Sequence, residues 1–152
     1  MMLRLPRPQL IWLNRAAATQ GEAGQVWRLL LAAEEGRALS DRDAKWLLEL
    51  LTRDYGQLEY QRRDFFKSYI YKTFQLAPAS KNQELEDEIA QVVVTQIRTL
   101  LMDKRHFSAV GMPLRVLGAR NRAVELSELA GLETHPDAQV VAEYKSARAS
   151  LK

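Results

Sequence analysis

The sequence predicts an all-α fold, a single-domain irregular or orthogonal bundle of six to seven helices. Helix-forming residues dominate, and the seven glycines and five prolines stand mostly where helices should begin or end. Apolar side chains recur every three or four residues, which is the spacing of one helix face. The 152 residues, 47% of them hydrophobic and 27% charged, suffice for one folded core. We therefore expect one helical domain over residues 1–152, with residues 1–8 as a flexible N-terminal arm.

Helix boundaries in the first half follow from capping residues. Gly36 suits the left-handed position that ends many helices. Ser40 is a helix N-cap, and the carboxylate of Asp43 stands three residues later, as in a capping box. Gly56 and the loop from Ala77 to Ser80 provide later ends. The four helices predicted in this half cover residues 10–19, 25–35, 41–56 and 58–76.

The second half shows the same signals. Ser80 or Asn82 can cap a helix whose first turn is acidic, the sign favoured by the positive end of the helix dipole. That helix is expected to end in the cationic stretch 104–106, again the favoured sign. Thr134 followed by Pro136 resembles another helix start. The three helices predicted in this half cover residues 83–106, 113–130 and 136–149.

Apolar residues at helical spacing define the predicted core. These side chains should all be buried if the periodicity is read correctly. They are Trp27, Leu30, Leu47, Leu51, Phe66, Ile70, Ile89, Val93, Ile97, Leu117 and Val124.

Composition also restricts the compartment. Charged residues interrupt every apolar run before it reaches the roughly 18 residues that span a bilayer, and Pro6 and Pro8 break the only candidate leader segment. The chain has no cysteine, so it can form no disulfide and no thiolate metal site. We expect a cytoplasmic protein with no membrane association.

The residues that usually carry catalysis are scarce. No phosphate-binding glycine loop and no nucleophile-elbow motif occurs in the sequence. The two histidines, His106 and His135, lack the four-residue spacing of a helical metal pair. Each also has an ordinary explanation, His106 beside cations at a helix end and His135 in a capping segment. We therefore predict no enzyme activity, no catalytic residue, no cofactor and no metal.

Charge is segregated along the chain. Residues 60–81 carry five cations against one acid, a net charge of +4, and residues 98–122 carry six cations against one acid, a net charge of +5. Acidic stretches occupy 82–97 and 123–143. Residues 60–74 combine four of the cations with six aromatic residues, a set too large to bury on one helix face.

This pattern predicts a sequence-nonspecific surface for the backbone of RNA or single-stranded DNA. Arginine outnumbers lysine 15 to 7, and its planar fork suits phosphate. Tyr69 or Tyr71 would stack on a base or ribose. The cations expected to contact phosphate are Arg62, Arg63, Lys67, Lys72, Arg105, Arg115, Arg120 and Arg122. In role and build such a protein is analogous to a small subunit of a CRISPR-type effector or a phage DNA-handling factor, working with other protein subunits or as a homo-oligomer.

Two alternatives remain open at this point. The cationic side chains can lie over buried aromatic rings while their charged ends stay in water. The chain can also be a helical protein–protein adaptor or regulatory subunit with no nucleic-acid role, which exposure of Trp12 or Trp46 would favour. Surface charge discriminates between the functions: a continuous positive stripe favours nucleic acid, and cations paired with the acids of 84–88 and 125–133 favour the adaptor.

Overall fold

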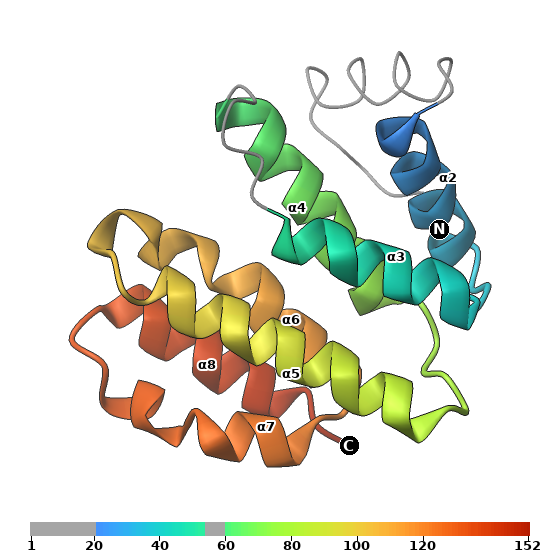
Figure 1. Ribbon diagram of the computed structural model, residues 1–152. Helices are drawn as coiled ribbons and strands as arrows, with labels where there is room; N and C mark the ends of the chain where they lie inside the picture. Colours follow the sequence, from blue (N-terminus) through green and yellow to red (C-terminus); the bar gives the residue numbers. More distant parts are fainter. Residues whose placement is uncertain (1–20, 54–59) are drawn as a thin grey trace. The chain divides into compact units, whose positions relative to one another are not determined.

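The computed structural model describes residues 21–53 and 60–152, apart from the side chains of 60–66 (Figure 1). These residues form seven α-helices and two 3₁₀ helices with no strand among them, which confirms the all-α class. The expected arm over 1–8 and helix over 10–19 lie outside the described residues. The chain divides into two compact units, 1–80 and 81–152, and each is described by itself.

The first unit is built around α4. Helix α2 packs mainly against α4, and α3 contacts α4 as well. The Ser40 hydroxyl accepts a hydrogen bond from the Asp43 N–H at 3.1 Å, so the predicted cap is confirmed. Gly36 has a φ of 84°, the left-handed conformation predicted for it. The helices span Glu22–Glu34 (α2), Asp41–Thr52 (α3) and Tyr60–Leu76 (α4).

The second unit packs α8 against α6, with α5 on the other side of α6. The Tyr144 hydroxyl, fully buried in α8, donates a 2.6 Å hydrogen bond to the Leu126 carbonyl in α7. The elements, drawn from lime to red in Figure 1, are α5 (Gln83–Leu100), η1 (Lys104–Ala109), α6 (Gly111–Ala119), α7 (Ala123–Glu128), η2 (Ala130–Thr134) and α8 (Ala138–Ala149).

The predicted core is confirmed at nine of its eleven positions: Trp27, Leu30, Leu47, Leu51, Ile70, Ile89, Val93, Ile97 and Leu117 are buried. Phe66 belongs to the side chains that the structure does not describe. Val124 is 68% exposed, so its assignment to the core was wrong.

The error at Val124 follows from a chain reversal that the predicted helix over 113–130 missed. Asn121 adopts a φ of 58° between α6 and α7, a left-handed conformation that asparagine tolerates better than most residues. The Arg122 N–H then bonds back to the Leu117 carbonyl at 2.9 Å and ends α6. The change of direction turns Val124 away from the core.

Other helix ends also differ from those predicted. Helix α5 ends at Leu100, and the cations of 104–106 begin η1 instead of ending α5. Of the two residues predicted as possible caps of α5, Asn82 is the cap, because its side-chain oxygen accepts from the Leu85 N–H at 3.2 Å. Asp137 replaces Thr134 as the cap of the last helix, because its carboxylate accepts from two first-turn N–H groups. None of the described helices combines the length and apolar content needed to cross a bilayer.

Candidate nucleic-acid interface

Helix α4 carries the first predicted set of contacts. The backbone of Arg62 and Arg63 is helical, but their side chains lie outside the described residues, so their proposed contacts stay predictions. Lys67 and Lys72 are half-buried. No side chain from 67 to 77 is exposed in the structure. This part of α4 therefore offers little surface to a polymer ligand.

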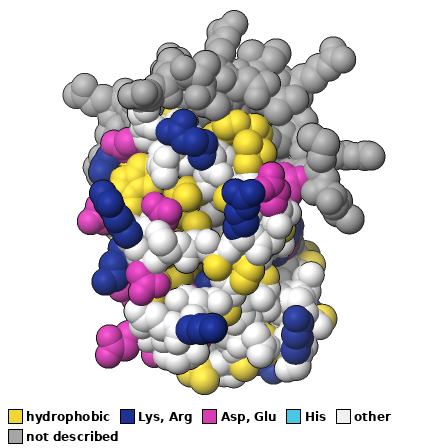
Figure 2. Space-filling view, turned by 90° about the vertical axis from the view of Figure 1, so that its right-hand side faces the viewer, with side chains coloured by type: hydrophobic (Ala, Val, Ile, Leu, Met, Phe, Trp, Pro, Cys, Tyr) yellow, Lys and Arg dark blue, Asp and Glu magenta, His cyan; other side chains and the backbone are white. Residues whose placement is uncertain are grey.

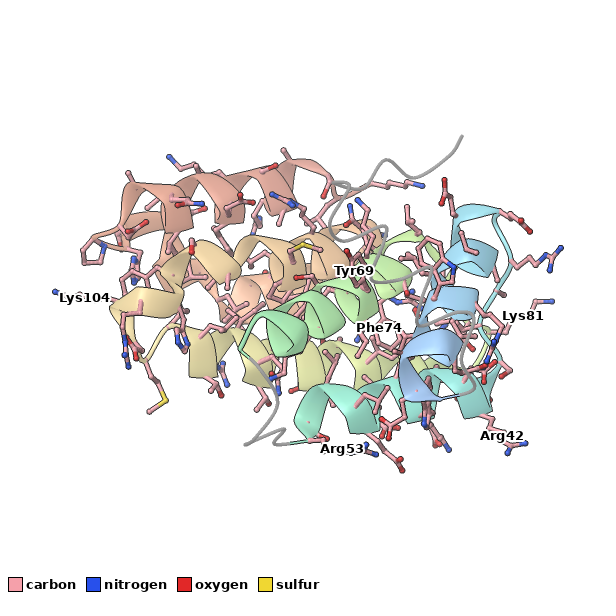
Figure 3. The ribbon with its side chains drawn as sticks, turned by 90° about the horizontal axis from the view of Figure 1, so that it is seen from above. Arg42, Arg53, Tyr69, Phe74, Lys81 and Lys104 are labelled. Atoms are coloured by element: carbon pink, nitrogen blue, oxygen red, sulfur yellow. The ribbon has the colours of Figure 1, made fainter. Side chains whose placement is uncertain are left out.

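Tyr69 and Tyr71 are 3% and 5% exposed. Burial raises the pKa of Tyr69 to about 12 and raises that of Tyr71 as well, because removal from water disfavours the phenolate. In Figure 3 Tyr69 and Phe74 lie among the helices, whereas Lys104 projects from the surface. The prediction that Tyr69 or Tyr71 stacks on a base is therefore wrong for this structure: both rings belong to the core.

The second predicted set begins in η1. The Arg105 guanidinium donates to the Asp103 carboxylate at 2.7 Å, and the Arg105 backbone N–H donates to it at 3.0 Å. These hydrogen bonds lower the pKa of the Asp103 carboxyl to about 2. The Arg105 side chain is 84% exposed, and exposed ion pairs of this kind contribute little to stability.

Arg115 lies on α6 and reaches the neighbouring helix. Its guanidinium donates to the Glu143 carboxylate of α8 at 3.0 Å. The Gly111 backbone lies against the same carboxylate, since a Cβ built on Gly111 would stand 2.7 Å from the Glu143 carboxyl carbon. Arg115 is therefore part of the packing between α6 and α8.

Arg120 forms a buried ion pair with Glu86 of α5. Two guanidinium nitrogens donate to the two carboxylate oxygens, the Nε–Oε1 distance being 3.1 Å. The side chains of Arg120 and Glu86 are 5% and 4% exposed. The Arg120 guanidinium, which was predicted to bind a phosphate, therefore already binds the Glu86 carboxylate, a group of similar geometry.

Arg122 bridges two acids. Its Nε donates to Glu125 at 2.6 Å and its Nη2 to Asp87 at 2.7 Å. The hydrogen bond to Glu125, followed by that to Asp87, raises the pKa of the Arg122 guanidinium above its usual value. We call the set of Arg120, Arg122, Glu86, Asp87 and Glu125 the arginine clamp. It ties the first turn of α5 to the corner between α6 and α7.

Close packing at this corner supports the clamp. A Cβ on Gly118 would stand 2.8 Å from the Ala147 carbonyl oxygen and would also overlap the Ser150 hydroxyl. The Asn121 side-chain oxygen accepts a 3.0 Å hydrogen bond from the Lys152 N–H. The residues that gather at the corner come from α5, α6, α7 and the segment after α8, which are far apart in the sequence.

The histidines have ordinary surroundings. His106 is half-buried in η1. The His135 ring meets the Phe107 ring edge-on with 4.9 Å between centroids, and its Nδ1 accepts from the Asp137 N–H at 3.0 Å. Within residues 21–53 and 60–152, no group of three or more metal-binding side chains comes together.

The second basic block is therefore largely paired with acids. On the face shown in Figure 2, the cationic side chains are scattered among acidic and apolar ones instead of forming a continuous stripe. The alternation of basic and acidic stretches along the sequence could have indicated these ion pairs, because each basic stretch is followed by an acidic one that can neutralise it. The partners of Arg120 and Arg122, 34 and 35 residues away, could not be assigned from that signal.

No family model, curated protein or solved structure matches the chain.

Proposed function

We propose that this chain is a non-catalytic helical protein that binds another protein, as an adaptor or regulatory subunit. One observation carries the proposal. Four arginines of the second predicted phosphate-binding set, 105, 115, 120 and 122, each hold a carboxylate of the same chain. For Arg115, Arg120 and Arg122 a carboxylate lies on another helix, which is the pairing expected of cations that stabilise the fold.

Phosphate binding by the arginine clamp would require its ion pairs to open. Freeing Arg120 would leave Glu86 buried without a partner, and breaking a buried pair costs about 3–5 kcal/mol. Nonspecific phosphate contacts are weak individually and are screened by salt. The internal carboxylates therefore compete successfully with phosphate for these guanidinium groups.

Exposed apolar side chains supply the surface that a protein partner would cover. Met102 is 86% exposed and Val124 is 68% exposed. Trp46 is half-buried on α3, and tryptophan is enriched at the centres of protein interfaces. Trp12 lies outside the described residues. These positions are the ones to probe for contact.

The first experiment measures affinity for labelled single-stranded RNA and DNA at about 10 mM salt, where phosphate contacts are strongest. We expect any binding to be unchanged in an Arg98→Glu/Lys104→Glu variant, which reverses the cations of 98–122 that have no acidic partner among the described residues. An Arg63→Glu/Lys67→Glu variant tests α4 in the same way. Loss of a salt-dependent affinity in either variant, with unchanged helicity, would support the nucleic-acid function and contradict the adaptor.

The second experiment looks for the partner directly. A photo-crosslinking amino acid is placed at Met102, Val124 or Trp46, and the matched control carries it at Lys45, an exposed residue of α3. In cells that express the full chain, we expect one protein species to be joined at an apolar position and not at Lys45. Equal labelling at all four positions, or none at any, would contradict a specific protein interface.

A further inference from the structure

Helix α8 carries cations that the fold does not use. Lys145 and Arg148 are exposed, and in the described part of the chain neither side chain has an acidic partner. Their spacing places them along one side of the helix. We call them the α8 cation row. They differ in this respect from Arg115, Arg120 and Arg122, which all hold carboxylates.

The helix dipole explains this row only in part. Cations are stabilised near a helix C-terminus within its last turn, which accounts for Arg148. Lys145 lies about one turn earlier. Beside the row, Ala142, Ser146 and Ala149 are exposed as well, and small side chains allow another helix to approach closely, because the side chains at a contact set the distance between helix axes.

Helix α5 carries the opposite charge. Glu84 and Glu88 are exposed, four residues apart on one face, and within the described residues neither has a cationic partner. Their neighbours Glu86 and Asp87 already bind the arginines of the clamp. We call Glu84 and Glu88 the α5 acid row.

The two rows belong to a unit with no net charge. Residues 81–152 contain ten Lys or Arg and ten Asp or Glu, so two such units do not repel each other at long range. The internal pairs use part of each sign, and the two rows are among the exposed charges that remain. The cation row extends roughly 5 Å and the acid row roughly 6 Å along their helices, from the rise of about 1.5 Å per residue.

We propose that the α8 cation row binds the α5 acid row of a second copy of this chain. The occupant follows from charge complementarity: the same unit presents both rows, and the small residues beside the cations leave room for a helix. Contacts made of exposed ion pairs are weak and screened by salt, so the association is concentration-dependent. The proposal is independent of the partner protein proposed above.

Sedimentation velocity of the full chain over a range of concentrations provides the first test. We expect self-association at about 10 mM salt and at least tenfold weaker association at about 1 M, as the Debye length falls from roughly 30 Å to roughly 3 Å. A chain that is monomeric at every concentration in low salt would overturn the proposal. So would association that is insensitive to salt.

Charge reversal provides the specific test. Lys145→Glu/Arg148→Glu and Glu84→Lys/Glu88→Lys should each abolish self-association, because like charges then face each other. An equimolar mixture of the two variants should associate again, as each reversed row meets its complement in the other protein. The matched control is Arg42→Glu/Lys45→Glu on α3, with the same change in net charge and no expected effect. Circular dichroism checks the fold, and Lys145→Gln/Arg148→Gln replaces the first variant if its helicity falls.

Two results would refute the pairing of rows. In the first, the mixture stays monomeric, or the α3 control loses association as fully as the α8 variant does. In the second, the wild-type chain does not self-associate, but binds single-stranded RNA with an affinity that only the α8 variant loses. The row would then be a phosphate-binding surface, the function that the sequence had suggested for other residues.

Discussion

Arg105 and Arg120 belong to the same basic stretch of sequence, and each is hydrogen-bonded to a carboxylate. Their surroundings differ: the Arg105 side chain is 84% exposed and the Arg120 side chain 5%. The partner of Arg105 stands two residues earlier, while that of Arg120 lies on another helix. The comparison shows that the number of charges in a stretch does not indicate the role of an arginine. Its burial decides whether it stabilises the fold or stays at the solvent-exposed surface.

The largest effect should come from breaking the buried pair. Arg120→Ala leaves the Glu86 carboxylate buried without a partner, so the free energy of unfolding should fall by about 3–5 kcal/mol. Urea denaturation followed by circular dichroism measures this change. A Glu86→Leu/Arg120→Met double variant removes both charges and should recover most of the stability. If the double variant is as unstable as Arg120→Ala, the loss of stability comes from altered packing and not from the unpaired charge of Glu86.

A smaller effect should come from the packing that supports the clamp. Gly118→Ala places a methyl group against the Ala147 carbonyl, and overpacking of this kind costs about 1–3 kcal/mol. Gly131→Ala is the matched control, since nothing lies within 4 Å of its added Cβ. The same urea titration compares the two variants. Equal stability of both would show that α6 and α8 separate at little cost.

The buried tyrosines of α4 should make the stability of the protein depend on pH, but only in the alkaline range. The pKa of Tyr69 is raised to about 12 in the folded state and is roughly 10 in the unfolded chain. The contribution of Tyr69 to the free energy of unfolding is therefore fully present below pH 10 and is lost as the pH rises toward 12. Stability measured between these values should fall less steeply for Tyr69→Phe or Tyr71→Phe than for wild type. A phenolate absorbance with a pKa near 10 that is present in the wild type and lost in Tyr69→Phe or Tyr71→Phe would contradict burial.

The smallest effect should come from the exposed pair. Arg105→Gln removes the main cause of the lowered Asp103 pKa, so that value should rise from about 2 toward the ordinary range. The pair's contribution to stability is present above the unfolded-state pKa and is lost as pH falls through about 2. Carboxyl carbon NMR follows the titration. We expect the urea midpoint at neutral pH to stay unchanged, and a clear decrease would mean that exposed and buried pairs are not so different.

Local signals predicted much of the fold. The Ser40 cap and the Gly36 ending follow from interactions within one turn, so the sequence around them is sufficient. Periodicity identified the buried positions of α3 and α5 because one face of each is apolar. These features need no knowledge of which helices meet.

The candidate site depends on contacts that local signals do not contain. The reversal at Asn121 is set by one left-handed residue within a stretch of good helix formers, so the predicted helix continued through it. Tyr69 and Tyr71 lie two residues apart, on different sides of α4, and both are buried, which an amphipathic pattern with one apolar face does not anticipate. The sequence showed an acidic stretch at 82–97 that could pair with Arg120, but it did not show that Glu86 is the partner.

The arginine clamp has a consequence for the order of events in folding. Its pairs with Glu86 and Asp87 join residues 34 and 35 positions apart, whereas the helices and their caps form from neighbours in the chain. Contacts between distant residues require a loop to close first. Interactions that form after the transition state slow unfolding and leave the folding rate almost unchanged. The clamp should therefore slow unfolding. An Arg120→Ala chain should refold at the same rate as the wild type but unfold much faster.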